Sequence, residues 1–149
     1  MQILIAYASI SGNTQKVAKH LYDYISRKYA KHKVKLIDLI TVKSKSLSEY
    51  DLFIVGASTW MDGEPNDIAL AFLDDLNTTK ADLKNLPCAI FGLGDSRYEK
   101  FCTVVESMSE SLTAHQAKVL KPSQKIDGNP TPEIMTVAED WIEQIITQI

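Results

Sequence analysis

The sequence predicts an α/β fold in which a parallel β-sheet carries helices on both faces. Short, continuous apolar runs alternate along the chain with longer stretches whose apolar residues recur at helical spacing. The apolar runs contain almost no charged residues, which is typical of strands covered on both sides, and such strands occur in parallel sheets. No low-complexity linker or internal repeat interrupts this alternation, so we expect residues 1–149 to form one domain.

Five strands are expected from the apolar runs. The first four lie at 3–7, 34–39, 52–56 and 88–92, and a weaker fifth strand lies at 117–120. Pro87 precedes the fourth strand, at a position where a residue without a backbone N–H is tolerated. Between the second and third strands, residues 41–48 are polar and carry no helical pattern.

Four helices are expected from apolar residues at helical spacing. Thr131 followed by Pro132 indicates the N-cap and the first turn of the last helix. The apolar positions are Val17, Ala18, Leu21 and Ile25 in the first helix, Ile68, Phe72, Leu73 and Leu76 in the second, Phe101, Val104, Val105, Met108 and Leu112 in the third, and Ile134, Ala138, Trp141, Ile142 and Ile145 in the fourth.

Composition excludes several classes of protein. The net charge of −3 argues against a nucleic-acid binder, which ordinarily presents a basic surface. No apolar run approaches the roughly 20 residues that span a bilayer, and the N-terminus does not resemble a signal peptide, so we expect a cytoplasmic protein that does not bind membranes. Cys88 and Cys102 are too far apart for a redox pair and too few for a zinc site. The three histidines have no metal-ligand spacing, so we expect no metal and solvated imidazoles.

The loops after the first, third and fourth strands are the candidate site, because ligands of doubly wound sheets lie beyond the carboxyl ends of the strands. The first loop is Ser9-Ile10-Ser11-Gly12-Asn13-Thr14 and leads directly into a helix. Hydroxyl and amide side chains at a helix N-terminus suit an anion. The loop has no lysine and matches neither GxxxxGK[ST] nor GxGxxG, so we expect a single phosphate group held by neutral donors.

The second and third loops combine aromatic residues with glycines. Residues 57–65 include Trp60 between Ser58-Thr59 and Met61-Asp62-Gly63, and residues 92–98 include Leu93-Gly94-Asp95 and Tyr98. A tryptophan in a polar loop exposes a large apolar surface unless it packs on something. Two aromatic residues beside a phosphate loop therefore indicate a site for a phosphorylated planar heterocycle.

These three loops resemble those of the flavodoxins. The first has that family's hydroxyl-x-hydroxyl-Gly-Asn-Thr pattern, the second has its Trp after a Ser/Thr pair, and residues 92–102 follow its Gly-x-Gly-Asp-x-x-Tyr-x-x-Phe-Cys pattern throughout. The resemblance extends over the whole chain. It implies a flavodoxin-like α/β/α sandwich with strand order 2-1-3-4-5. The fifth strand has no room for an inserted loop, so the chain resembles the short-chain flavodoxins of bacteria.

The resemblance also implies the cofactor and the residues around it. Flavin mononucleotide (FMN) would be bound noncovalently, with Trp60 and Tyr98 covering the two faces of its ring. Ile10 stands where many members have a hydroxyl residue. Met61 stands where many have glycine, and we expect its β-carbon to make the semiquinone less stable. The implied cofactor-binding residues are Ser9, Ile10, Ser11, Gly12, Asn13, Thr14, Ser58, Thr59, Trp60, Met61, Asp62, Gly63, Leu93, Gly94, Asp95, Tyr98, Phe101 and Cys102.

The implied function is one-electron transfer at low potential, through the semiquinone/hydroquinone couple and without substrate turnover or catalytic residues. The partners would be a flavodoxin/ferredoxin reductase and client oxidoreductases. They would dock at an acidic flavin edge formed by Asp62, Glu64, Asp67, Asp95 and Glu99, with the protein as a monomer. An FMN-dependent quinone or nitro reductase of the same fold is the alternative. A phosphoacceptor receiver domain is a more distant one, since it needs an Asp at the end of the third strand, where this chain has 56–58 as Gly-Ala-Ser.

Overall fold

The computed structural model describes residues 1–59 and 63–149. Trp60, Met61 and Asp62, to which the sequence assigns roles in cofactor binding, therefore lie outside the described residues. Along the chain the elements are β1 (Gln2–Ala8), α1 (Asn13–Lys28), β2 (Lys33–Asp38), the short 3-10 helices η1 (Leu39–Thr41) and η2 (Ser44–Glu49), β3 (Leu52–Ser58), α2 (Asp67–Thr79), β4 (Pro87–Gly94), α3 (Val104–Ala114), β5 (Lys118–Val119), β6 (Gln124–Asp127) and α4 (Pro132–Ile146).

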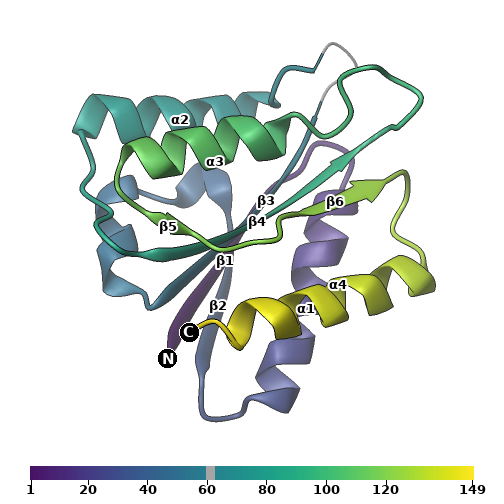
Figure 1. The fold of residues 1–149 in the computed structure, drawn as a ribbon, viewed down its shortest axis with the longest axis horizontal. Helices are drawn as coiled ribbons and strands as arrows, with labels where there is room; N and C mark the ends of the chain where they lie inside the picture. The colour runs from purple at the N-terminus through teal and green to yellow at the C-terminus, as the bar shows by residue number, and fades with distance from the viewer. Residues whose placement is uncertain (60–62) are drawn as a thin grey trace.

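The strands form a parallel sheet of order β2-β1-β3-β4-β5, which confirms the predicted fold and strand order. Figure 1 shows α2 and α3 on one face of the sheet and α1 and α4 on the other. Successive residues of β1 point to opposite faces, so Leu4 and Ala6 pack with α2 and α3 while Ile3 and Ile5 pack with α1 and α4. A strand covered on both sides has to be apolar at every position, which explains the continuous apolar runs in the sequence.

The prediction of a single fifth strand at 117–120 was incomplete. Two separate segments, β5 and β6, occupy this edge of the sheet, and both pair with β4. Pro122 lies in the break between them, where a residue without an N–H cannot continue the ladder. Only Ile126 of β6 is buried, and its neighbours are polar because the strand lies at the edge. This polar pattern concealed β6 in the sequence.

Two other local predictions can be compared with the structure. Thr131 caps α4 as expected, because its side chain accepts a hydrogen bond from the backbone N–H of Ile134 at 3.3 Å. The polar segment 41–48 begins at the last residue of η1 and includes most of η2, and helical periodicity could not reveal these 3-10 helices because each is too short. In the part of the chain that is described, no helix combines the length and the apolar character needed to span a membrane.

The prediction of solvated histidines was incomplete, because each of the three is only partly exposed and has a polar partner. His20 lies 2.7 Å from a carboxylate oxygen of Glu139 on α4, and His32 lies 3.0 Å from the N-terminal ammonium group. His115 contacts the Ala81 carbonyl at 2.8 Å. Each partner is distant in sequence, so only the packing of the elements could bring these groups together.

Candidate cofactor site

The loops after β1, β3 and β4 converge at the carboxyl ends of these strands and enclose a cavity of about 210 Å³. The structure therefore brings together residues from all three predicted loops. A fourth segment, which the sequence did not indicate, follows β6 and completes the wall. The cavity is lined by Ser11, Asn13, Thr14, Ser58, Thr59, Leu93, Gly94, Gly128 and Asn129.

The first loop presents the N-terminus of α1 to this cavity. Gly12 is the N-cap residue and has a left-handed backbone with φ of 91°, which a residue with a β-carbon would adopt only with strain. Gly12 has no side chain to cap the helix, and no acidic residue lies in the first turn of α1. The hydroxyl of Ser9 accepts a hydrogen bond from the Gly12 N–H at 3.0 Å and so folds the loop back on itself. The first amides of α1 are thus available to an anion.

The side chains of this loop face different ways. Thr14 is buried and lines the cavity, together with Ser11 and Asn13. Ile10 is 60% exposed and is not among the residues that line the cavity. Its replacement of a hydroxyl residue therefore leaves an apolar side chain at the surface, and any contact that it makes with a ligand would come from its backbone.

The second loop is fixed by Asn66, a residue that the sequence analysis did not identify. Its side chain is fully buried. The amide nitrogen donates to the Ala8 carbonyl and to the Ser58 hydroxyl, each at 2.9 Å, and the amide oxygen accepts from the Ala69 N–H at 3.0 Å as the N-cap of α2. One side chain thus joins the end of β1, the end of β3 and the start of α2. An asparagine in a polar loop gives no sign of this role in the sequence.

The ends of the second loop are tied to α3 and β4. Thr59 donates its N–H to the Leu93 carbonyl at 2.9 Å, and its hydroxyl accepts from the Val104 N–H at 3.0 Å. The Thr103 hydroxyl donates to the Gly63 carbonyl at 2.6 Å. Gly63 has a φ of 86°, and a β-carbon there would lie 2.4 Å from the Lys100 side chain. Both flanks of 60–62 are therefore fixed to the third loop and its helix.

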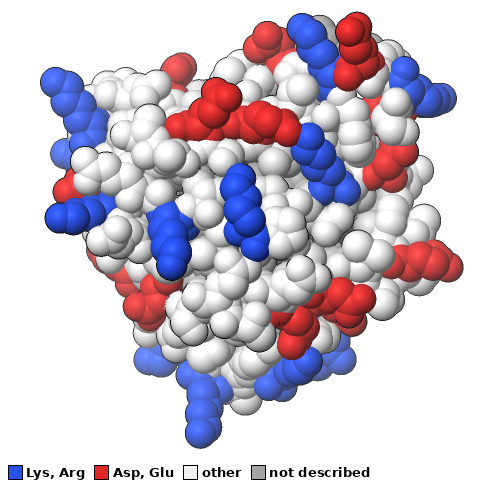
Figure 2. Space-filling view, viewed as in Figure 1, with Lys and Arg blue, Asp and Glu red and all other residues white. Residues whose placement is uncertain are grey.

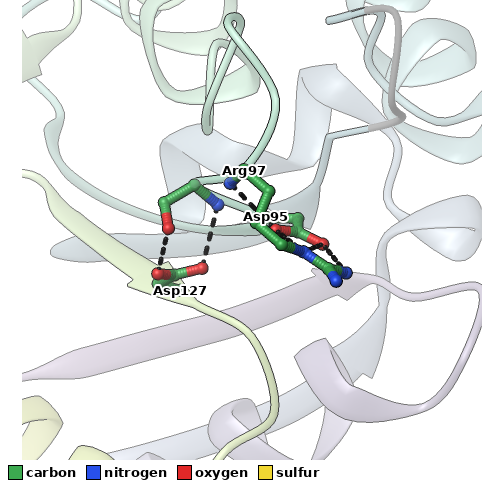
Figure 3. Close-up of polar contacts among 4 residues, drawn as sticks. Asp95, Arg97 and Asp127 are labelled. Carbon is green, nitrogen blue, oxygen red and sulfur yellow. Dashed lines mark hydrogen bonds and ion pairs between the residues drawn. The ribbon is translucent and has the colours of Figure 1, made fainter.

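The third loop is organised around Asp95. Its carboxylate accepts hydrogen bonds from the backbone N–H and the guanidinium of Arg97, with 2.5 Å between Nη2 and Oδ2 (Figure 3). These hydrogen bonds lower the pKa of Asp95 to about 2. Tyr98 follows this turn and is 40% exposed; it is not among the residues that line the cavity, and it has no packing partner among the described ring contacts. The side chain is available to stack on a planar ligand.

Phe101 and Cys102 lie behind the third loop instead of among the residues that line the cavity. Cys102 is fully buried and has a φ of 52°. Its thiol lies 3.5 Å from the Gly92 carbonyl, and a β-carbon on Gly94 would come within 3.0 Å of its sulfur. Burial raises the pKa of Cys102 to about 11, so the group stays a thiol at neutral pH. Its role is to support the backbone of the loop.

The segment after β6 contacts two of the loops. The Gly128 N–H donates to the Gly94 carbonyl at 2.9 Å, and the Asn13 side chain donates to the Asn129 side chain at 3.0 Å. Asp127 accepts hydrogen bonds from both the backbone N–H and the hydroxyl of Ser96 (Figure 3). The sequence could have indicated this segment only through β6, which was not predicted.

A larger hollow of about 680 Å³ lies at the opposite end of the sheet, lined by both chain termini and by residues near 48–51 and 82–87. It lies at the amino ends of the strands, away from the three loops. Within the described residues, no group of three or more His, Cys, Asp or Glu side chains could hold a metal ion. The smaller cavity is therefore the one that residues of the three predicted loops surround.

Comparison with known proteins agrees with this arrangement. Residues 5–141 match the family described as Flavodoxin. The chain belongs to the flavodoxin family. It is 34% identical to a flavodoxin of Nitratidesulfovibrio vulgaris (strain Miyazaki F), over 99% of this chain and 98% of that protein. The solved structure of oxidised flavodoxin 2 from Bacillus cereus matches with a TM-score of 0.90 and 33% identity, over 100% of both chains.

A further relative is a much longer protein. The chain is 34% identical to the sulfite reductase [NADPH] flavoprotein alpha-component of Escherichia coli, over 97% of this chain but 23% of that protein. As a short-chain flavodoxin, the protein has FMN as its cofactor and transfers electrons without turning over a substrate of its own. The alternative of a quinone or nitro reductase is not supported.

Proposed function

We propose that the protein carries single electrons at low potential between a reductase and client oxidoreductases, with FMN bound at the three loops of the described cavity. The convergence of these loops around neutral hydrogen-bond donors at the start of α1 is the observation that supports this proposal most directly. We further propose that residues 1–149 act as one domain, in the cytoplasm, as a monomer.

The residues at the start of α1 fit the phosphate of FMN. Ser11, Asn13 and Thr14 line the cavity, and the uncapped amides of the helix lie beside them. A phosphate would supply the acceptor atoms that these amides lack and would meet the positive end of the helix dipole. The left-handed Gly12 keeps the backbone free of a β-carbon where the anion would approach. Ser9 shapes the loop and Ile10 contributes its backbone.

The ring would lie between the second and third loops. Tyr98 would cover one face, and Leu93, Gly94 and Asp95 would contact the ring edge and the sugar chain; the roles of Trp60, Met61 and Asp62 rest on the sequence alone. FMN supplies the one-electron chemistry when bound. The chain orients the ring and limits its access to water. Because Arg97 is paired with Asp95, the two charges offset each other and leave the charge of an added electron uncompensated, which favours a low potential.

The rim of the site offers a docking surface for a basic partner. Glu64, Asp67, Asp95, Glu99 and Asp127 belong to the segments that surround the cavity or adjoin them. At the upper right of Figure 2, where these loops lie, Asp and Glu side chains occur together with Lys and Arg. An acidic excess steers a basic partner toward the exposed ring, and salt weakens that steering. Reduction of the protein by such a partner should therefore slow as ionic strength rises; a rate unaffected by salt would contradict this docking surface.

Titration of the apoprotein with FMN tests the proposed site. Riboflavin, which lacks the phosphate, serves as the matched ligand, and quenching of flavin fluorescence reports binding. We expect FMN to bind at least 100-fold more tightly than riboflavin, a difference of about 2.7 kcal/mol. Thr14→Val, which keeps the shape of the buried side chain but removes its hydroxyl, should weaken FMN binding and leave riboflavin binding unchanged. Equal affinity for the two flavins would refute the assignment of the phosphate to the start of α1.

A further inference from the structure

The segment Asp127-Gly128-Asn129 connects two loops that bind to different parts of the proposed cofactor. At one end, Asp127 accepts two hydrogen bonds from Ser96 in the third loop. At the other, Asn129 accepts one from Asn13 in the first turn of α1. Between them, the Gly128 N–H donates to the Gly94 carbonyl at 2.9 Å. The segment follows β6 at the edge of the sheet and reaches 31 residues back along the chain to Ser96 and 116 residues back to Asn13.

The two hydrogen bonds that Asp127 accepts fix the backbone of Ser96, the residue that donates them. A carboxylate that accepts both the N–H and the hydroxyl of one residue determines where that residue lies and how its peptide is oriented. Ser96 stands between Asp95, whose carboxylate is held by Arg97, and the residues that lead to Tyr98. Figure 3 shows the contacts of Asp95 and Asp127 in this turn. The 94–98 turn is therefore held on one side by its own Asp95–Arg97 pair and on the other by Asp127. These hydrogen bonds also lower the pKa of Asp127, so its carboxylate is charged at neutral pH.

We infer that Asp127 is a positioning residue of the flavin site, which preorganises the 94–98 turn and links it through residues 128–129 to the phosphate loop. The inference rests on the proposed function, because it concerns the loops that hold FMN. A turn that is already fixed in the apoprotein loses less conformational freedom when a ligand binds, so the affinity is higher. Without Asp127, FMN itself would have to order the turn.

The decisive comparison is between Asp127→Ala and Asp127→Asn. Alanine removes both hydrogen bonds to Ser96. Asparagine removes the charge but retains an oxygen for the Ser96 N–H and an amide that can donate to the Ser96 hydroxyl. We expect Asp127→Ala to raise the dissociation constant of FMN about tenfold, which corresponds to about 1.4 kcal/mol, and Asp127→Asn to recover most of this loss. The visible circular dichroism of bound FMN, which reports the surroundings of the ring, should change in the alanine variant and return in the asparagine variant.

Asp51→Ala is the matched control. Asp51 is also exposed, and its carboxylate accepts the Gln2 N–H at 2.7 Å across 49 residues of sequence, but it lies at the opposite end of the sheet. We expect FMN affinity to be unchanged in this variant. If Asp51→Ala weakened FMN binding as much as Asp127→Ala, the effect would arise from global stability and the inference would be wrong.

Three further outcomes separate the inference from its alternatives. If both Asp127 variants changed affinity equally, the carboxylate would act only through its charge and the positioning role would be refuted. Wild-type affinity in both would refute it as well. Failure of the wild-type apoprotein to take up FMN would instead refute the proposed function.

If Asp127→Ala does not fold, Ser96→Ala serves in its place, because it removes one of the two hydrogen bonds and leaves Asp127 unchanged. We expect about a threefold rise in the dissociation constant of FMN, and no rise would overturn the inference.

Discussion

Replacement of Asn66 by alanine should destabilise the protein more than any single helix cap can explain. The substitution removes three hydrogen bonds of a fully buried side chain: those donated to Ala8 and Ser58 and the one accepted from Ala69 at the start of α2. Loss of an N-cap costs about 1 kcal/mol, and each of the other two hydrogen bonds contributes about 0.5–1.5 kcal/mol. The free energy of unfolding should therefore fall by about 3 kcal/mol.

Urea denaturation of the apoprotein, followed by circular dichroism, measures this change as a shift of the midpoint at constant slope. Thr131→Ala is the control, because Thr131 caps α4 through one exposed hydrogen bond at 3.3 Å and makes no buried contact of this kind. It should lower the free energy of unfolding by about 1 kcal/mol. If Asn66→Ala cost no more than Thr131→Ala, the two buried amide contacts would contribute nothing, and the role assigned to Asn66 would be wrong.

Three other substitutions test the packing and the electrostatics. Gly56→Ala should lower the free energy of unfolding by about 3 kcal/mol, because its β-carbon would lie 2.0 Å from the Phe91 ring; urea denaturation checks this, and recovery in the double variant with Phe91→Leu would confirm the cause. Burial, aided by the nearby N-terminal charge, lowers the pKa of His32. The unfolded chain therefore binds more protons near the ordinary pKa of about 6.5, and stability should fall as the pH drops through this range. His32→Gln should flatten that part of the profile of unfolding free energy against pH, and an unchanged slope would exclude His32 as its source. Finally, Arg97→Ala should raise the pKa of Asp95 from about 2 toward its ordinary value of 3.8, which carboxyl-carbon NMR titration measures directly; a pKa that stays near 2 would show that the Arg97 side chain is not the cause.

Much of the architecture was predictable because burial on both faces leaves a clear pattern. The strands β1, β3 and β4 lie in the middle of the sheet and are apolar at all but their end residues, so they stand out in the sequence even though their neighbours in space are distant along the chain. β6 lies at an edge, buries only Ile126 and carries polar residues elsewhere, so it has no such pattern. Local hydrophobic patterns therefore reveal strands that are buried on both faces and do not reveal β6 at the edge of the sheet.

The residues of the candidate site likewise fall into two groups: those that the sequence could predict and those that it could not. Its three loops could be predicted because phosphate binding and ring stacking require particular residues within a few positions of one another, as at 9–14 and 92–102. Only the tertiary structure showed that Asn66 joins the ends of two strands and that residues 127–129 connect the third loop to the start of α1. Asn66, Asp127 and Asn129 are ordinary residues for polar loops. Their roles come from partners that lie up to 116 residues away in sequence, and the chain brings such partners together only when the sheet has formed.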